Sequence, residues 1–146
     1  MSLINDGNQG EHEQYSFALL ENKNTMLFIW EYVEGLSIAD FRDGIITLAT
    51  QCKKMLPDHI VIDAASLDQN SPAVKWLQGE ESNTYLNYSE WWSREILPIY
   101  HEVGVASLAV GTGDPNAPGA LENSPPGVNF KIGYFTDVEA ALSWRV

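Results

Sequence analysis

Residues 37–63, with the sequence SIADFRDGIITLATQCKKMLPDHIVID, decide the fold of this chain. Apolar residues recur at spacings of three and four from 38 to 56, which is the period of one helix face. Ser37 and Asp40 form a capping pair at the start, and Pro57 follows the last helical residue as a stop. The sequence therefore predicts a long amphipathic helix that begins after Ser37 and ends before Pro57.

Gly44 is the one residue that opposes this helix, since glycine costs about 1 kcal/mol relative to alanine in a helix interior. We expect a close contact between helix and sheet at this position. After the helix, Ile60–Ile62 forms a short apolar run between turn-forming residues. Such a run is typical of a parallel strand that is buried on both faces.

The remaining segments of the chain complete an order in which strands and helices alternate. They comprise a strand hairpin at 15–19 and 26–33, a short helical turn at 71–77, a helix at 89–103 kinked by Pro98, strands at 105–110 and 128–134, a loop at 111–127, and a final helix at 138–142 capped by Thr136 or Asp137. This order predicts a single α/β domain. Its mixed sheet has four to five strands, an antiparallel first strand, and helices packed on it.

Residues 1–14 lack any apolar period and contain several turn formers, so we expect a mobile N-terminal tail. Residues 15–146 are then a single domain, because a chain of this length supports one core.

The charge of the chain limits its partners. Twenty Asp and Glu residues oppose eight Lys and Arg, which gives a net charge of -12 and repels phosphate backbones, so nucleic acid is not expected as a partner. Cys52 is the only cysteine, which excludes an intrachain disulfide and a zinc cluster of thiolates. The sequence contains no signal-peptide pattern and no apolar run long enough to span a membrane, so we expect a cytoplasmic protein. We also expect that it binds no cofactor.

Residues 134–144, YFTDVEAALSW, resemble the end of STAS-like (SpoIIAA-like) proteins, in which a strand leads into a short helix that ends in tryptophan. Residues 30–35 with the helix that follows, Ile60–Asp63 and Gly104–Val110 fall where that family has its strands and first helix. The resemblance covers 15–144. It implies the fold given above, and in some members it implies binding of apolar ligands or association with membranes.

Anti-sigma-factor antagonists of that family carry an Asp-Ser-Ser-Gly type motif whose serine is phosphorylated by a partner kinase. This chain has no such motif. Ser66, within Asp63-Ala64-Ala65-Ser66, follows the corresponding strand and is the candidate phosphoacceptor, although its sequence context differs.

Catalytic motifs are absent from the sequence. His12, His59 and His101 stand alone, without the spacing of a metal site. A hydrolase built from Asp63, Ser66 and His101 remains a rival hypothesis, although no nucleophile-elbow pattern surrounds any serine. Gly111–Asp114 resembles a fragment of a phosphate loop but lacks the lysine, so turn formation explains it better.

Aromatic residues are concentrated in one part of the chain. Trp91 and Trp92 are adjacent on a helix, about 100° apart, so both cannot point straight into the core. We weigh three explanations: a covering loop at 66–88, a contact with a protein partner or a second copy, and an apolar ligand pocket. The candidate contact residues are Trp76, Tyr88, Trp91, Trp92 and Tyr100.

These observations favour a non-enzymatic binding or protein-interaction module. Its occupant would be a protein partner, a second copy in a homodimer, or a small apolar ligand. A small hydrolase and a membrane-associating carrier of apolar ligands are the rival hypotheses.

Overall fold

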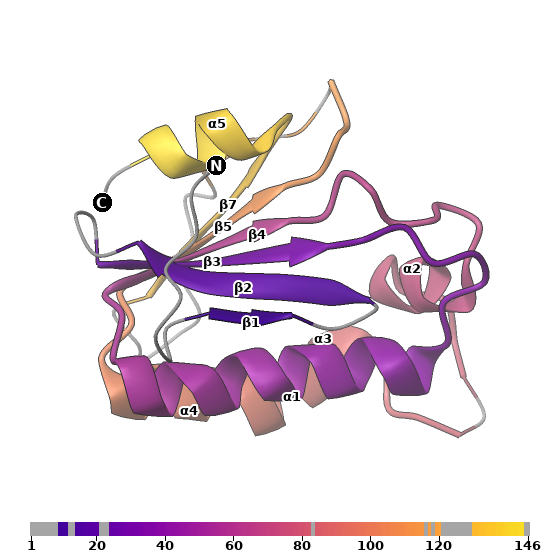
Figure 1. The fold of residues 1–146 in the computed structure, drawn as a ribbon. Helices are drawn as coiled ribbons and strands as arrows, with labels where there is room; N and C mark the ends of the chain where they lie inside the picture. The colour runs from indigo at the N-terminus through magenta and orange to yellow at the C-terminus, as the bar shows by residue number, and fades with distance from the viewer. Residues whose placement is uncertain are drawn as a thin grey trace.

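The computed structural model describes residues 9–11, 14–20, 24–82, 84–115, 117, 119–120 and 130–144. A seven-stranded sheet with the order β1-β2-β3-β4-β5-β7-β6 forms the centre of the molecule (Figure 1). Its strands are β1 (Gln9–Glu11), β2 (Tyr15–Leu20), β3 (Thr25–Trp30), β4 (His59–Asp63), β5 (Ser107–Gly111), β6 (Gly119–Ala120) and β7 (Lys131–Phe135).

The strand directions confirm the expected mixed sheet. β3, β4, β5 and β7 are parallel, whereas β2 runs antiparallel to β1 and β3, and β6 runs antiparallel to β7. The five longer strands are the expected ones, and the two short strands extend the sheet at its edges. The α/β class with an antiparallel first strand is therefore confirmed.

Residues 9–11, within the segment 1–14 for which the sequence predicts a mobile tail, form the short strand β1. They pair with β2 from Ala18 to Ser16. Alternating apolar residues could not reveal this strand. An edge strand pairs through backbone N–H and C=O groups, which requires no particular side chains. Residues 1–8, 12 and 13 lie outside the described part of the chain.

Helix α1 (Ile38–Met55) confirms the boundaries that the sequence predicts. The Ser37 hydroxyl oxygen accepts a hydrogen bond from the Asp40 backbone N–H at 3.0 Å. At the other end Leu56 adopts a left-handed conformation, with a φ of 51°, just before Pro57. Gly44 lies against the ring of Trp30 on β3, so the expected close contact between helix and sheet is present.

The expected kinked helix at 89–103 consists of three consecutive segments: α3 (Tyr88–Trp91), the π-helix η2 (Trp92–Ile96) and α4 (Leu97–Val103). The backbone N–H of Leu97 donates to the carbonyl of Trp92, five residues earlier. Pro98 has no N–H to offer the carbonyl of Arg94, and the widened turn lies directly before it.

The helices divide between the two faces of the sheet. α1, α3 and α4 cover one face, and α5 (Val138–Ser143) covers the other (Figure 1). α2 (Pro72–Leu77), capped by Ser71, packs against α1 and α3. The larger core lies on the α1 side, and the smaller one comprises Leu27, Val61, Ala109 and Ala141.

The end of β3 and the expected loop at 111–127 differ from expectation. β3 ends at Trp30 rather than at Val33, and β6 lies within the expected loop at 111–127. Residues 128 and 129 of the expected last strand lie outside the described residues. Within the part of the chain that the structure describes, no helix combines the length and apolar character needed to cross a bilayer.

Candidate functional site

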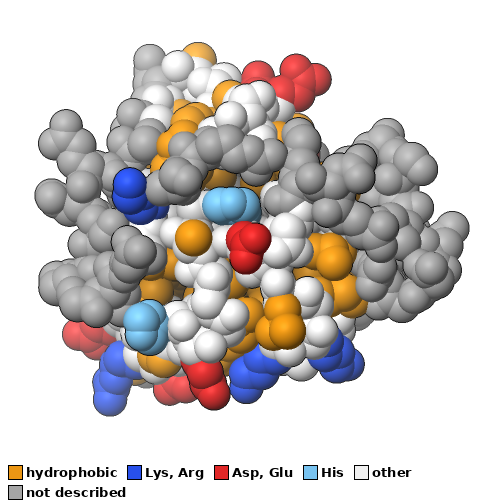
Figure 2. Space-filling model, turned by 90° about the vertical axis from the view of Figure 1, so that its left-hand side faces the viewer, with side chains coloured by type: hydrophobic (Ala, Val, Ile, Leu, Met, Phe, Trp, Pro, Cys, Tyr) orange, Lys and Arg blue, Asp and Glu red, His pale blue; other side chains and the backbone are white. Residues whose placement is uncertain are grey.

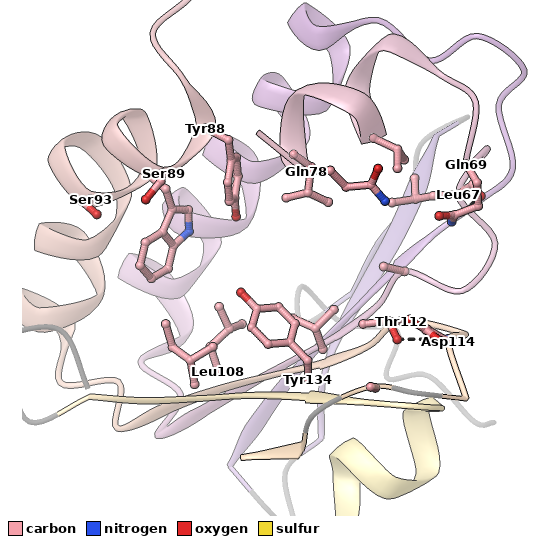
Figure 3. A pocket seen from close by; sticks show the side chains of 17 residues that line it. Leu67, Gln69, Gln78, Tyr88, Ser89, Ser93, Leu108, Thr112, Asp114 and Tyr134 are labelled. Carbon is pink, nitrogen blue, oxygen red and sulfur yellow. Dashed lines mark hydrogen bonds between the residues drawn. The ribbon is translucent and has the colours of Figure 1, made fainter. Parts of the chain in front are cut away.

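A cleft of about 870 Å³ opens at the C-terminal ends of β4, β5 and β7, on the face of the sheet that also carries α1. This volume is typical of small-molecule sites, and in α/β sheets ligands bind outside the carboxyl ends of parallel strands. Figure 3 shows the lining side chains: Ala64, Leu67, Gln69, Val74, Leu77, Gln78, Tyr88, Ser89, Trp92, Ser93, Leu108, Val110, Thr112, Asp114, Ala117, Ile132 and Tyr134.

The floor of the cleft comes from β5 and β7. Leu108 is in register with Ile132, and Val110 with Tyr134, so these four side chains share one face of the sheet. Val110, Ile132 and Tyr134 are only partly buried. The floor is therefore largely apolar and open to an occupant.

Two tyrosine hydroxyls enter the cleft from opposite walls. Tyr88 belongs to the first turn of α3 and Tyr134 to β7, and both phenolic oxygens point into the space between them (Figure 3). Burial raises the pKa of Tyr88, and the nearby Tyr134 raises it further. Burial also raises the pKa of Tyr134. Both phenols are therefore neutral at physiological pH and can donate hydrogen bonds.

The rim beside β5 is held by short-range hydrogen bonds. The Thr112 hydroxyl donates to the carbonyl of Phe135 at 3.1 Å and accepts from the backbone N–H of Asp114 at 3.1 Å. Gly113 has a φ of 80° and donates its N–H to the carbonyl of Thr136 at 2.8 Å. The stretch 111–114 is thus a turn that extends the pairing of β5 with β7, as the sequence predicts.

The loop after β4 forms the opposite rim. Asp68 accepts hydrogen bonds from the backbone N–H groups of Gly35 at 2.9 Å and Asn70 at 3.0 Å. These bonds lower the pKa of Asp68, with the Gly35 bond contributing most. Leu67 and Gln69, on either side of this carboxylate, line the cleft. The acidic side chain therefore fixes the loop that carries two lining residues.

Two of the five aromatic candidates line the cleft. Trp92 and Tyr88 contribute to its wall. Trp92 also packs against Phe130 and Tyr100, with ring centroids 6.1 Å away in both cases. Trp92 points toward the cleft and Trp91 does not, as expected for adjacent helical positions.

Trp76, Trp91 and Tyr100 belong to the core instead. Trp76 is buried and donates its indole N–H to the carbonyl of Leu86 at 2.9 Å, so part of the expected covering loop does pack over it. Trp91 lies under the guanidinium of Arg42, 5.0 Å from the ring centroid. Tyr100 is 1% exposed. These three side chains offer no accessible contact surface.

The hydrolase residues considered from the sequence do not come together. The Asp63 carboxylate accepts the backbone N–H of Ala65 at 3.2 Å, and Ser66 lies exposed in the same turn, after the end of β4. His101 lies on α4, shortly before the start of β5. Because β4 and β5 are parallel and in register, roughly 13 Å of strand separates the two ends.

A different serine and histidine form a pair that the sequence analysis missed. Nδ1 of His59 and Oγ of Ser107 are 2.7 Å apart. They are the first residues of β4 and β5, and only the strand register reveals that they are neighbours. Figure 2 looks onto this end of the molecule, where acidic, basic and histidine side chains are interspersed among uncharged atoms.

In the described part of the chain, no group of three or more His, Cys, Asp or Glu side chains is placed to hold a metal ion. Comparison of the chain with protein-family models, curated proteins and solved structures gives no significant match.

Proposed function

We propose that this chain is a small-molecule-binding domain whose ligand occupies the cleft at the ends of β4, β5 and β7. The observation that carries the proposal is the cleft itself, with its apolar floor and two convergent tyrosine hydroxyls. A few polar groups in an apolar pocket are the usual composition of a ligand site. The sequence leads us to expect a non-enzymatic binding module with a protein partner, a second copy or a small apolar ligand. The proposal selects the small ligand.

The same geometry weighs against a protein-contact role for the aromatic segment. Trp76, Trp91 and Tyr100 are 1 to 3% exposed, and a contact residue must be accessible before its partner arrives. The relation to STAS-like domains stays a proposal. It is supported by the antiparallel first strand, the parallel strands that follow and the terminal helix.

The proposal is tested with Nile red, an uncharged fluorescent probe, titrated into the purified protein. Val110→Phe extends a larger side chain from the floor into the cleft, and we expect it to weaken probe binding at least about ten-fold by occupying the space. Ile46→Phe, on the exposed side of α1, is the matched control and leaves binding unchanged.

Ser93→Trp, which obstructs the rim from the exposed surface of η2, provides a second variant that does not alter the core. Probe binding that is equally strong in wild type, Val110→Phe and Ser93→Trp would place the probe elsewhere and end the proposal. Circular dichroism of each variant separates loss of binding from loss of folding.

A second candidate function, hydrolysis, has one supporting observation. His59 and Ser107 form a serine–histidine hydrogen bond, which is the first requirement of an activated nucleophile. Ser107 is only 3% exposed, however, so a substrate carbonyl could reach it only after rearrangement of its surroundings. Labelling by a fluorophosphonate that disappears in Ser107→Ala would support this function, and absence of labelling in wild type would exclude it.

A further inference from the structure

We infer that the ligand of the cleft is an uncharged molecule with an apolar body and a carbonyl-type oxygen, which accepts hydrogen bonds from the hydroxyls of Tyr88 and Tyr134. This inference rests on the proposed function and adds the chemical class of the ligand.

The positions of the two hydroxyls are fixed by the elements that carry them. Asn87 caps α3 by accepting the backbone N–H of Glu90 at 2.8 Å, which holds the first turn in place. The Tyr88 ring lies edge-on to Trp76 at 5.4 Å and tilted against Trp91 at 6.2 Å. Tyr88 is therefore oriented by packed rings before any ligand arrives.

Tyr134 approaches from the floor of the cleft. It pairs with Val110 in the register of β5 and β7, and its hydroxyl points toward the wall formed by α3 and η2 (Figure 3). Neither this hydroxyl nor that of Tyr88 makes a hydrogen bond with another described residue. Two donors that face one space fit an acceptor with two lone pairs, which is what a carbonyl oxygen provides.

Charge excludes an anionic ligand. No Lys, Arg or His occurs among the described residues that line the cleft, whereas the carboxylate of Asp114 does. The burial that raises the pKa of Tyr88 and Tyr134 disfavours a phenolate, and it disfavours a bound carboxylate or phosphate for the same reason. The net charge of -12 adds long-range repulsion.

The other residues that line the cleft favour a ligand whose body is apolar. Leu108 and Ile132 form the floor, Val74 and Leu77 come from α2, and the ring of Trp92 closes one side. Apolar surface on several sides stabilises an apolar body by removing it from water. The cleft thus combines two hydrogen-bond donors with a non-polar enclosure.

The test uses three naphthalenes as competitors of Nile red: 2-acetylnaphthalene, a neutral ketone; 2-ethylnaphthalene, which lacks the oxygen; and 2-naphthoate, an anion. We expect the ketone to bind about 2- to 10-fold more tightly than the hydrocarbon, as one or two net hydrogen bonds allow. We expect the anion to bind at least about ten-fold more weakly than the ketone.

Tyr88→Phe and Tyr134→Phe keep the rings and remove the hydroxyls. Each variant reduces the advantage of the ketone over the hydrocarbon and weakens Nile red, which also carries a carbonyl. Tyr32→Phe, at a position 62% exposed and outside the cleft, is the matched control and changes neither value.

The outcomes separate this inference from the proposed function. If Val110→Phe abolishes Nile red binding but both tyrosine variants bind like wild type, or if 2-naphthoate competes as well as the ketone, the ligand class is wrong and the cleft remains a binding site. If Val110→Phe and Ser93→Trp leave Nile red binding unchanged, the proposed function itself fails.

Discussion

Gly44 determines how closely α1 approaches the sheet. A methyl group at this position would overlap with the ring of Trp30, which is itself buried and packed against Phe41 with ring centroids 5.1 Å apart. The ring therefore cannot move aside without disturbing the core. Glycine lowers the stability of the helix, but a side chain at this position would destabilise the fold more, because it would overlap with Trp30.

We expect Gly44→Ala to lower the free energy of unfolding by about 1–3 kcal/mol, the usual effect of overpacking, although alanine is the better helix former. Urea denaturation followed by circular dichroism measures the change. Thr50→Ala, at an exposed position of the same helix, is the control and should stay within about 0.5 kcal/mol of wild type. A stabilised Gly44→Ala would contradict the close contact.

Cys52 gives a prediction about alkaline pH. Burial raises the pKa of its thiol to about 12, whereas the thiol of an unfolded cysteine has a pKa of about 8.5. Between these values the folded state binds the proton that the unfolded state has lost, so stability falls as the pH rises. Below the unfolded pKa this contribution is fully present.

Urea titrations at several pH values between 8 and 10 should show a decline in stability that approaches about 1.4 kcal/mol per pH unit above the unfolded pKa. Cys52→Ala lowers stability at every pH by opening a small cavity, but it should remove this part of the pH dependence. The same slope in both proteins would show that Cys52 is not its source.

Among the secondary-structure elements, η2 explains how two adjacent tryptophans are both buried. Trp91 and Ile96 are five residues apart, as are Trp92 and Leu97, and all four are buried. In an α-helix that spacing places residues on different faces, whereas the widened turn of a π-helix aligns residues five apart. The π-turn thus acts as a one-residue insertion in an α-helix.

This geometry predicts that the chain tolerates a deletion. Removing Arg94, an exposed residue of η2, should convert the π-turn into an α-turn and keep the buried stripe, at a cost of at most about 1–2 kcal/mol. Removing Asp43, an exposed residue of α1, rotates Ile45 and Leu48 away from the core and should prevent stable folding. Thermal unfolding distinguishes the two; equal losses would contradict the insertion.

At the scale of the whole molecule, acidic residues outnumber basic ones by twelve, and like charges are closer together in the folded chain than in the unfolded one. Raising NaCl from about 10 to about 150 mM shortens the screening length from about 30 to about 8 Å. We expect the free energy of unfolding to rise by roughly 1 kcal/mol over this range.

Urea titrations at both salt concentrations measure this effect. The same pair of titrations near the isoelectric point, where the net charge is small, serves as the control and should show little change. A salt effect of equal size at both pH values would assign it to something other than charge repulsion.

Part of the cleft could be predicted from the sequence. Tyr88 and Trp92 stand out because aromatic residues cluster around them, and both line the cleft. Val110 and Tyr134 did not stand out as site residues, because an apolar alternation gives the same pattern whether a strand faces a packed helix or an open space. Trp76 and Trp91 have the same local signal as Trp92 but face the core.

The local sequence pattern was enough to predict the order of the major elements, the boundaries of α1, the close contact at Gly44 and the antiparallel first strand. These follow from local periods, caps and turn residues, which act over a few positions of the chain. Three features became apparent only in the folded chain: the short edge strand β1, the neighbouring pair His59 and Ser107, and the cleft. Each of these depends on which distant segments share a face or an edge of the sheet, and strand register, not local pattern, sets that arrangement.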